Sequence, residues 1–132
     1  MHIFISFSKH DIAFARYLRN LLEDRDFTVW MDDQNRMSDT AQWPTFEQQI
    51  ATCAAFIIIM SPEALDSKWI EREIQTAQSL TSPKTIIPVL LMGEPWESLG
   101  NLPYEDMRAG LAVKLSPTLL ENLTLAIRSA VA

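Results

Sequence analysis

The chain has 132 residues, of which 48% are hydrophobic, and it carries a formal net charge of -6. A chain of this length buries a core of ordinary size, so we treat residues 1–132 as a single domain. Acidic side chains outnumber Lys and Arg by 17 to 11, and no basic cluster is present. This balance argues against a nucleic-acid backbone or an anionic membrane surface as a partner.

The sequence also limits the compartment and the metal chemistry. No apolar run reaches the roughly 20 residues that span a bilayer, and the first predicted strand begins almost at Met1, which leaves no room for a signal peptide. A single cysteine, Cys53, fits a reducing compartment, so we expect a cytoplasmic protein. Cys53 precedes a buried strand and is interpreted as a core residue. Together with His2 and His10 it offers no metal-ligand spacing.

The chain opens with a predicted strand and helix. Residues 2–7 (HIFISF) are β-branched and aromatic, which favours a central strand. Ser8 and Asp11 match the Ser-x-x-Asp capping box, which predicts a helix directly after them. The buried face of that helix is predicted to hold Phe14, Leu18, Leu21 and Leu22.

A second strand and a long loop follow. Residues 27–31 (FTVWM) predict the strand, with Asp32 at its end. Residues 32–42 are polar and show no period, so they predict a loop longer than is usual in an α/β unit. A short helix with Pro44 in its first turn comes next, and its apolar positions are Trp43, Phe46 and Ile50.

The middle of the chain predicts the most deeply buried element. Residues 54–60 (AAFIIIM) form an unbroken apolar run, which indicates a strand buried on both faces. The helix predicted at residues 68–80 faces the sheet with a stripe of Ile70, Ile74 and Ala77. A fourth strand is predicted at residues 85–91. Pro88 within it removes a ladder donor, so one side of the strand should be irregular or unpaired there.

The C-terminal third is less regular. Residues 92–110 are rich in Pro, Gly, Glu and Asp, and they predict an irregular excursion with room for a helical turn. Residues 111–115 (LAVKL) are the candidate last strand. Ser116 and Pro117 supply the start of a closing helix, whose apolar face is predicted to hold Leu120, Leu123, Ile127 and Val131.

This alternation of strands and helices is typical of a parallel sheet covered on both faces. Right-handed crossovers favour an α/β, flavodoxin-like fold: a five-stranded parallel sheet of order 2-1-3-4-5 with helices on both faces. Ligands bind such sheets beyond the carboxyl ends of the strands, at the switch point between the first and third strands. The residues that arrive there are Phe7, Ser8, Lys9, Asp32 and Ser61.

One carboxylate stands out as a candidate catalyst. Trp69 and Glu73 are four residues apart on the predicted helix, so they lie on one face, at the border between core and solvent. Glu71 points almost the opposite way and should lie in water. From helix geometry alone two interpretations stay open: Glu73 does chemistry beside an aromatic wall, or it is an ordinary solvated carboxylate.

Short blocks in a fixed order extend nearly from end to end. They are FISFS (4–8) with Asp11, VWMD (29–32), Trp43, FIIIMSP (56–62), SKW (67–69) leading to Glu73, and IIPV (86–89). In order and spacing the sequence resembles a Toll/interleukin receptor (TIR) domain. The resemblance implies one TIR domain over residues 1–132, either trimmed from a longer chain or triggered by another protein.

The resemblance implies an NAD+ nucleosidase of the microbial type, because the enzymatic TIR domains carry a catalytic glutamate four residues after a tryptophan. Glu73 would then be the catalytic residue, and the products would be nicotinamide and ADP-ribose or a cyclic ADP-ribose. Residues implied to bind substrate are Phe7, Ser8, Lys9, Asp32, Trp43, Ser67 and Trp69. NAD+ is a substrate here, so no cofactor is implied. The family also implies self-association and a role in immune or anti-phage signalling, with a sensor or effector as partner or fused domain.

The residues suit that chemistry. Breaking the bond between nicotinamide and ribose builds oxocarbenium character, which a carboxylate offsets. Trp69 and Trp43 could stack on flat rings, and Lys9 could pair with the pyrophosphate. One departure concerns the loop at residues 32–42, which lacks the Gly or Pro-Gly usual in this family.

The sequence admits two rival interpretations. The first is a TIR scaffold that signals only by homotypic association, because some non-catalytic TIR domains also carry this glutamate. The second is a phosphoacceptor receiver, which shares the strand order. A receiver needs an aspartate at the end of the third strand, where this sequence has Met60 and Ser61, so this class is disfavoured.

Overall fold

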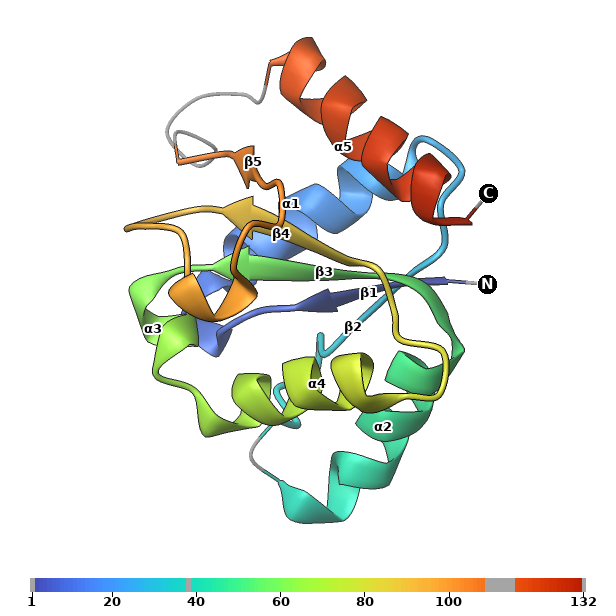
Figure 1. Ribbon diagram of the computed structural model, residues 1–132, viewed down its shortest axis with the longest axis vertical. Helices are drawn as coiled ribbons and strands as arrows, with labels where there is room; N and C mark the ends of the chain where they lie inside the picture. The colour runs from blue at the N-terminus through green and yellow to red at the C-terminus, as the bar shows by residue number, and fades with distance from the viewer. Residues whose placement is uncertain (1, 38, 109–115, 132) are drawn as a thin grey trace.

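The computed structural model describes residues 2–37, 39–108 and 116–131. In this part of the chain five strands form one parallel sheet in the order β2-β1-β3-β4-β5 (Figure 1), which confirms the predicted strand order. The strands are β1 (His2–Ser6), β2 (Val29–Met31), β3 (Cys53–Met60), β4 (Ile86–Leu90) and β5 (Glu105–Asp106).

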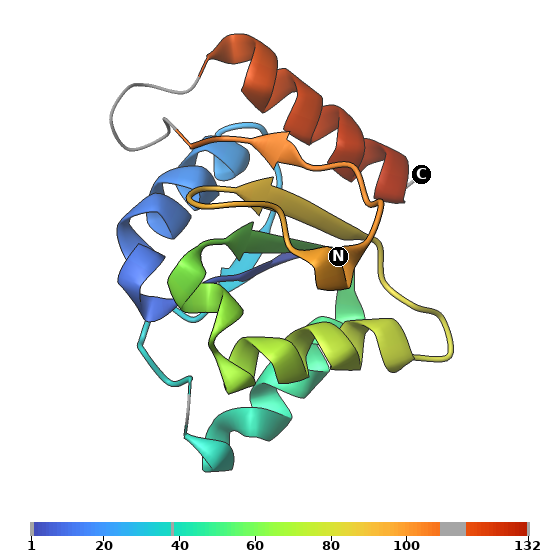
Figure 2. The same cartoon turned by 60° about the vertical axis from the view of Figure 1, so that its left-hand side comes forward.

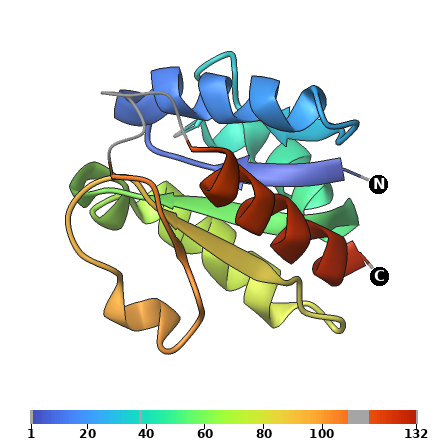
Figure 3. The same ribbon diagram turned by 90° about the horizontal axis from the view of Figure 1, so that it is seen from above.

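Helices cover both faces of the sheet, as predicted (Figure 1). The helices α1 (Ile12–Glu23) and α5 (Pro117–Val131) lie on one face, and Figure 3 shows them in front of the strands. The helices α2 (Trp43–Thr52) and α4 (Lys68–Ser79) lie on the other face, with the short α3 (Pro62–Leu65) before α4. A parallel sheet needs this double cover because both of its faces are apolar.

The alternation of side chains along each strand divides the core into two clusters. Ile3 and Ile5 of β1 face α1 and α5, where they meet Phe14, Leu18, Leu22, Leu123 and Ile127. Phe4 of β1 points the other way and meets the α2 and α4 side, with Trp43, Phe46, Ile50, Trp69 and Ile70. The apolar faces predicted from helical periodicity are therefore the faces that pack on the sheet.

The start of α1 differs from the predicted capping box. A 3-10 turn, η1 (Lys9–Asp11), precedes the helix, and the Ser8 hydroxyl accepts a hydrogen bond from the backbone N–H of His10. The Asp11 carboxylate accepts a hydrogen bond from Ser61 Oγ on the neighbouring strand connection. Asp11 thus joins two loops at the carboxyl edge of the sheet.

The sequence prediction did not include the strand β5. The region 92–110 was expected to be irregular, yet β5 lies within it and pairs with Val89 and Leu90 of β4. The helical turn allowed for in this region is η3 (Glu97–Leu99), which Figure 2 shows in the segment between β4 and β5. The candidate strand at 111–115 lies outside the described residues.

Pro88 fits the strand pattern for a specific reason. Pro88 lies opposite Ile58 in the ladder between β3 and β4. Backbone groups of successive strand residues point alternately to the two neighbouring strands: Leu91 N–H bonds to β3, and Leu90 C=O bonds to β5. By this alternation the nitrogen of Pro88, like the backbone groups of Leu90, faces β5. Pairing with β5 starts only at Val89. The missing donor therefore falls where no partner strand needs it, as predicted.

Candidate functional site

The candidate catalyst Glu73 lies inside the core. Its side chain is only 2% exposed, and Oε1 accepts a hydrogen bond of 2.8 Å from Ser6 Oγ at the end of β1. The expectation of a carboxylate at the border between core and solvent was therefore wrong. The physical reason is tertiary packing: Phe46 of α2 packs on Trp69 of α4, and the Glu73 carboxyl bonds to Ser6 at the end of β1. Glu71, two residues earlier, is exposed as predicted.

Burial sets the protonation state of Glu73. The pKa of Glu73 is raised from an ordinary 4.5 to about 8, and desolvation is the largest cause. The Asp32 carboxylate also raises this pKa, whereas the Ser6 hydrogen bond and Trp69 lower it. Desolvation dominates because the charged form has lost its water. In this conformation Glu73 therefore holds a proton at neutral pH.

The two predicted aromatic walls pack on each other. The rings of Trp43 and Trp69 meet edge to face with centroids 5.3 Å apart, and Phe46 meets Trp69 at 5.0 Å. The Arg72 guanidinium lies 4.0 Å from the centroid of the Trp43 ring. Both indoles are buried in the α2 and α4 cluster. The Trp69 indole N–H is also buried and has no hydrogen-bond partner, so one donor beside Glu73 is unused.

Asp32 holds the loop that follows β2. Its carboxylate accepts hydrogen bonds from the backbone N–H groups of Arg36 and Met37, at 2.8 Å each through Oδ2, and it pairs with the Arg36 guanidinium at 3.5 Å. Asp32 is only 2% exposed. Within the described residues, its carboxylate therefore acts as the anchor of its own loop.

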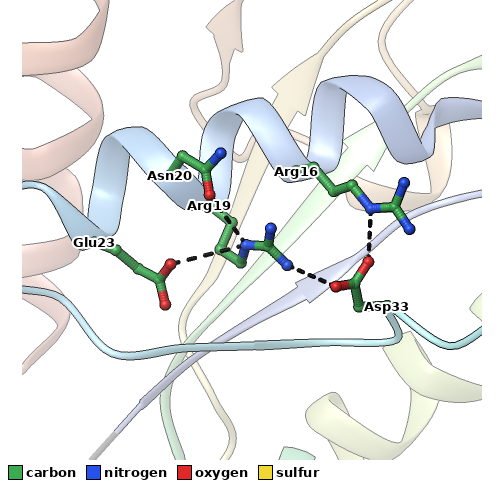
Figure 4. Close-up of polar contacts among 5 residues, drawn as sticks. All are labelled: Arg16, Arg19, Asn20, Glu23 and Asp33. Atoms are coloured by element: carbon green, nitrogen blue, oxygen red, sulfur yellow. Dashed lines mark hydrogen bonds and ion pairs between the residues drawn. The ribbon is translucent and has the colours of Figure 1, made fainter.

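The next residue, Asp33, ties the same loop to α1 (Figure 4). Its two carboxylate oxygens accept hydrogen bonds from Arg16 at 2.6 Å and Arg19 at 3.0 Å, and these bonds hold the pKa of Asp33 below its ordinary value. The family-typical glycine is absent, and Asn35 supplies the left-handed turn instead, with φ 53°. Asn tolerates that conformation better than most residues, so the loop can turn without glycine.

The remaining predicted site residues occupy several places. Phe7 packs in the core on the α1 side, away from the Trp43 and Trp69 cluster. Ser8 is buried at the η1 turn, and Lys9 beside it is exposed. The Ser67 hydroxyl accepts a hydrogen bond from the N–H of Ile70 and so caps α4. The structure thus brings Glu73 together with Trp69, Trp43 and Asp32, and roles in substrate binding stay predictions.

The described cavities lie elsewhere on the molecule. One, of about 500 Å³, is lined by residues that include Pro88 of β4 and Trp96 and Tyr104 of the segment between β4 and β5. Two further cavities, of about 360 and 380 Å³, flank the same segment beside α4 and α3. Glu73 lines none of these three cavities, and its 2% exposure shows that it is closed to solvent in this conformation.

The sequence prediction missed Ser6 and the pairing of Asp11 with Ser61. Ser6 is 1% exposed and makes the only side-chain hydrogen bond to Glu73 found among the described residues. A signal was present in the sequence, because Ser6 is a polar residue within the apolar run at residues 2–7. Its partner could not be read from the sequence, since 67 positions separate the two residues.

The described residues contain neither a metal-binding cluster nor a membrane-spanning helix. No group of three or more His, Cys, Asp or Glu side chains among them is arranged to hold a metal ion. In the same part of the chain, no helix is long and apolar enough to cross a membrane.

Comparison with known proteins identifies the family. A family model described as "TIR domain" matches residues 3–119, so the chain belongs to the TIR domain family. TIR domains generally associate with one another, which supports a signalling or scaffold role. A comparison with curated proteins gave no match.

Solved structures agree on the fold. One is the crystal structure of the TIR domain of the Toll-related receptor TRR-2 from Hydra magnipapillata, with a TM-score of 0.75 and 19% sequence identity. The match covers 96% of this chain and 97% of that chain. At this identity the likeness concerns the fold alone, which is the predicted flavodoxin-like arrangement.

Proposed function

We propose that this TIR domain is an NAD+ nucleosidase in which Glu73 is the catalytic residue. The observation that supports it most is the setting of the Glu73 carboxyl: buried at the carboxyl edge of the sheet, bonded by Ser6 and adjacent to Trp69. A fully buried glutamate with a raised pKa is costly for folding, and such groups are concentrated at functional sites.

The reaction needs the ionised form of Glu73. As the bond between ribose carbon and nicotinamide nitrogen breaks, its electron pair neutralises the pyridinium, and positive charge develops on the ribose. A carboxylate beside the ribose offsets that charge and accepts hydrogen bonds from the sugar hydroxyls. Water then attacks to give ADP-ribose and a released proton, or an atom of the substrate's own adenosine attacks to give a cyclic ADP-ribose. The positive charge of bound NAD+ would itself lower the pKa of Glu73.

Substrate must gain access to this carboxylate. Glu73 is 2% exposed, so cleavage requires the side chains packed around it to move. Self-association of TIR domains is the proposed trigger, set off by a sensor or effector protein in immune or anti-phage signalling. Lys9 is exposed beside the end of β1 and is proposed to pair with the pyrophosphate. The other proposed substrate-binding residues are Phe7, Ser8, Asp32, Trp43, Ser67 and Trp69.

The test is release of nicotinamide from NAD+, followed by chromatography at a protein concentration where light scattering reports assembly. Wild type is compared with Glu73→Ala and with Glu71→Ala, a matched control on the same helix whose side chain is exposed. We expect wild type and Glu71→Ala to cleave NAD+ and Glu73→Ala to be inactive. The product peak distinguishes hydrolysis from cyclisation. Equal activity in all three proteins would contradict the role of Glu73.

A second candidate is the non-catalytic scaffold, which signals by homotypic association. The closure of Glu73 favours it, because a carboxylate that is protonated and sealed in the core behaves as a structural group. An assembled wild type that leaves NAD+ intact would establish this alternative.

A further inference from the structure

Ser6 is the residue that fixes the position of the Glu73 carboxyl. It is the last residue of β1, a central strand that pairs with β2 and β3, and its own ladder partner is Ile58 of β3. Its Oγ donates to Glu73 Oε1 at 2.8 Å, and both side chains are buried. One carboxylate oxygen, Oε1, is thus tied to the end of β1.

The surroundings of Glu73 make Ser6 more important. From α2 the uncharged rings of Trp43 and Phe46 pack on Trp69, whose N–H has no hydrogen-bond partner among the described residues. The one charge that acts on Glu73 is the Asp32 carboxylate at the end of β2, which is of the same sign and is itself paired with Arg36. Among the described residues, no Lys, Arg or His side chain is a cause of the Glu73 pKa shift. Of the groups that lower the pKa of Glu73, Ser6 is the first in size, ahead of the smaller influence of Trp69, and it donates a hydrogen bond of 2.8 Å.

We propose that Ser6 is a positioning residue for the NAD+-cleaving reaction: its hydroxyl holds Oε1 so that Oε2 faces the ribose, and it stabilises the ionised carboxylate that the reaction needs. This inference rests on the proposed function, since it assigns Ser6 a part in that reaction. Ser6 acts through Glu73 and is not itself required to touch the substrate.

Loss of the hydroxyl should change how activity depends on pH. The rate rises with pH as Glu73 ionises, so the acid limb of kcat/KM reports the Glu73 pKa in the free protein. A hydrogen bond to a charged group is strong enough to move such a pKa by about one unit. Removing it disfavours ionisation, so the acid limb of Ser6→Ala should move to higher pH by about one unit, and activity at neutral pH should fall about tenfold.

The experiment measures kcat/KM for NAD+ across pH, in the assembled state, for wild type, Ser6→Ala, Ser6→Thr and Ser61→Ala. Ser6→Thr keeps the hydroxyl and should restore the wild-type limb. Ser61→Ala is the matched control: it removes another buried serine that donates to a buried carboxylate, Asp11, at the same edge of the sheet. Thermal unfolding at each pH confirms that every variant is folded. If Ser6→Ala does not fold, Ser6→Cys replaces it and should shift the limb in the same direction.

The outcomes separate the two proposals. A limb that moves in Ser6→Ala and stays in place in Ser61→Ala and Ser6→Thr supports the positioning role. An active wild type whose acid limb is unchanged in Ser6→Ala overturns the role of Ser6 and leaves the proposed function intact. Equal shifts in Ser6→Ala and Ser61→Ala also overturn it, because they indicate a general effect of lost stability. A wild type that is inactive at every pH overturns the proposed function, and the inference about Ser6 with it.

Discussion

Glu73→Gln keeps the size of a buried side chain and its acceptor for the Ser6 hydroxyl, but it removes the only titratable group of α4 that lies in the core. In the wild type the folded-state pKa of Glu73 is about 8, above an ordinary 4.5 in the unfolded chain. The folded state therefore holds this proton more tightly than the unfolded state. Stability from this group is full below about pH 4.5 and is lost progressively as the pH rises to about 8.

The size of the effect follows from the shift. A rise in pKa from 4.5 to about 8 corresponds to about 5 kcal/mol of folding free energy at high pH, at 1.36 kcal/mol for each pKa unit. This free energy is a large share of the stability of an ordinary domain, whose free energy of unfolding is only about 5–15 kcal/mol. Glu73→Gln escapes this loss. We compare the free energy of unfolding of the variant with that of wild type. The advantage of the variant should be about 4 kcal/mol larger at about pH 9 than at about pH 5.

Urea unfolding of both proteins at these two pH values measures the effect. The difference between the variants is the relevant quantity, because the other titrating groups, such as Asp11 and Glu105, are common to both and cancel. A stability difference that is the same at both pH values would refute the reasoning. It would mean that Glu73 is hydrated or ionised in the folded protein and that its burial is not maintained in solution.

Three further predictions concern other parts of the site. Asp32→Ala removes the carboxylate that accepts hydrogen bonds from the N–H groups of Arg36 and Met37. Urea unfolding should therefore show a free energy of unfolding lower by about 2–3 kcal/mol. A loss below about 0.5 kcal/mol would contradict the anchor role. Ser67→Ala removes the cap of α4 and should cost about 1 kcal/mol by the same assay, whereas an unchanged midpoint would argue against the cap. Burial raises the pKa of the Cys53 thiol to about 11. A thiol reagent at neutral pH should therefore label Cys53 quickly only when urea unfolds the protein. Fast labelling of the native protein would refute the core position of Cys53.

Much of the fold could be predicted because the spacing of apolar residues along the sequence indicates which segments are helices or strands and which of their faces are buried. Phe14, Leu18 and Leu22 lie on one face of α1 at helical spacing, and the apolar run of β3 needs cover on both sides, which fixes the layers. The strand β5 could not be found in this way. It has two residues, Glu105 and Asp106, without apolar alternation, and it is a strand only because its backbone pairs with β4.

The candidate site was predicted less completely. The spacing of Trp69 and Glu73 places them on one face of α4, as the structure has them, but it does not say what covers that face. The cover is α2, whose Phe46 packs on Trp69, and this tertiary contact turns an expected border carboxylate into a buried one. Ser6 was missed for the same reason, because its hydrogen bond to Glu73 joins residues far apart in the sequence.

The most direct test of the central claim is nicotinamide release from NAD+ by assembled wild type beside Glu73→Gln. The variant is expected to be at least as stable as wild type, so a loss of activity in it cannot be assigned to unfolding. The account predicts steady release of nicotinamide by wild type and none by Glu73→Gln. Release at the same rate by both proteins, or by neither when both are assembled, would contradict a catalytic role for Glu73.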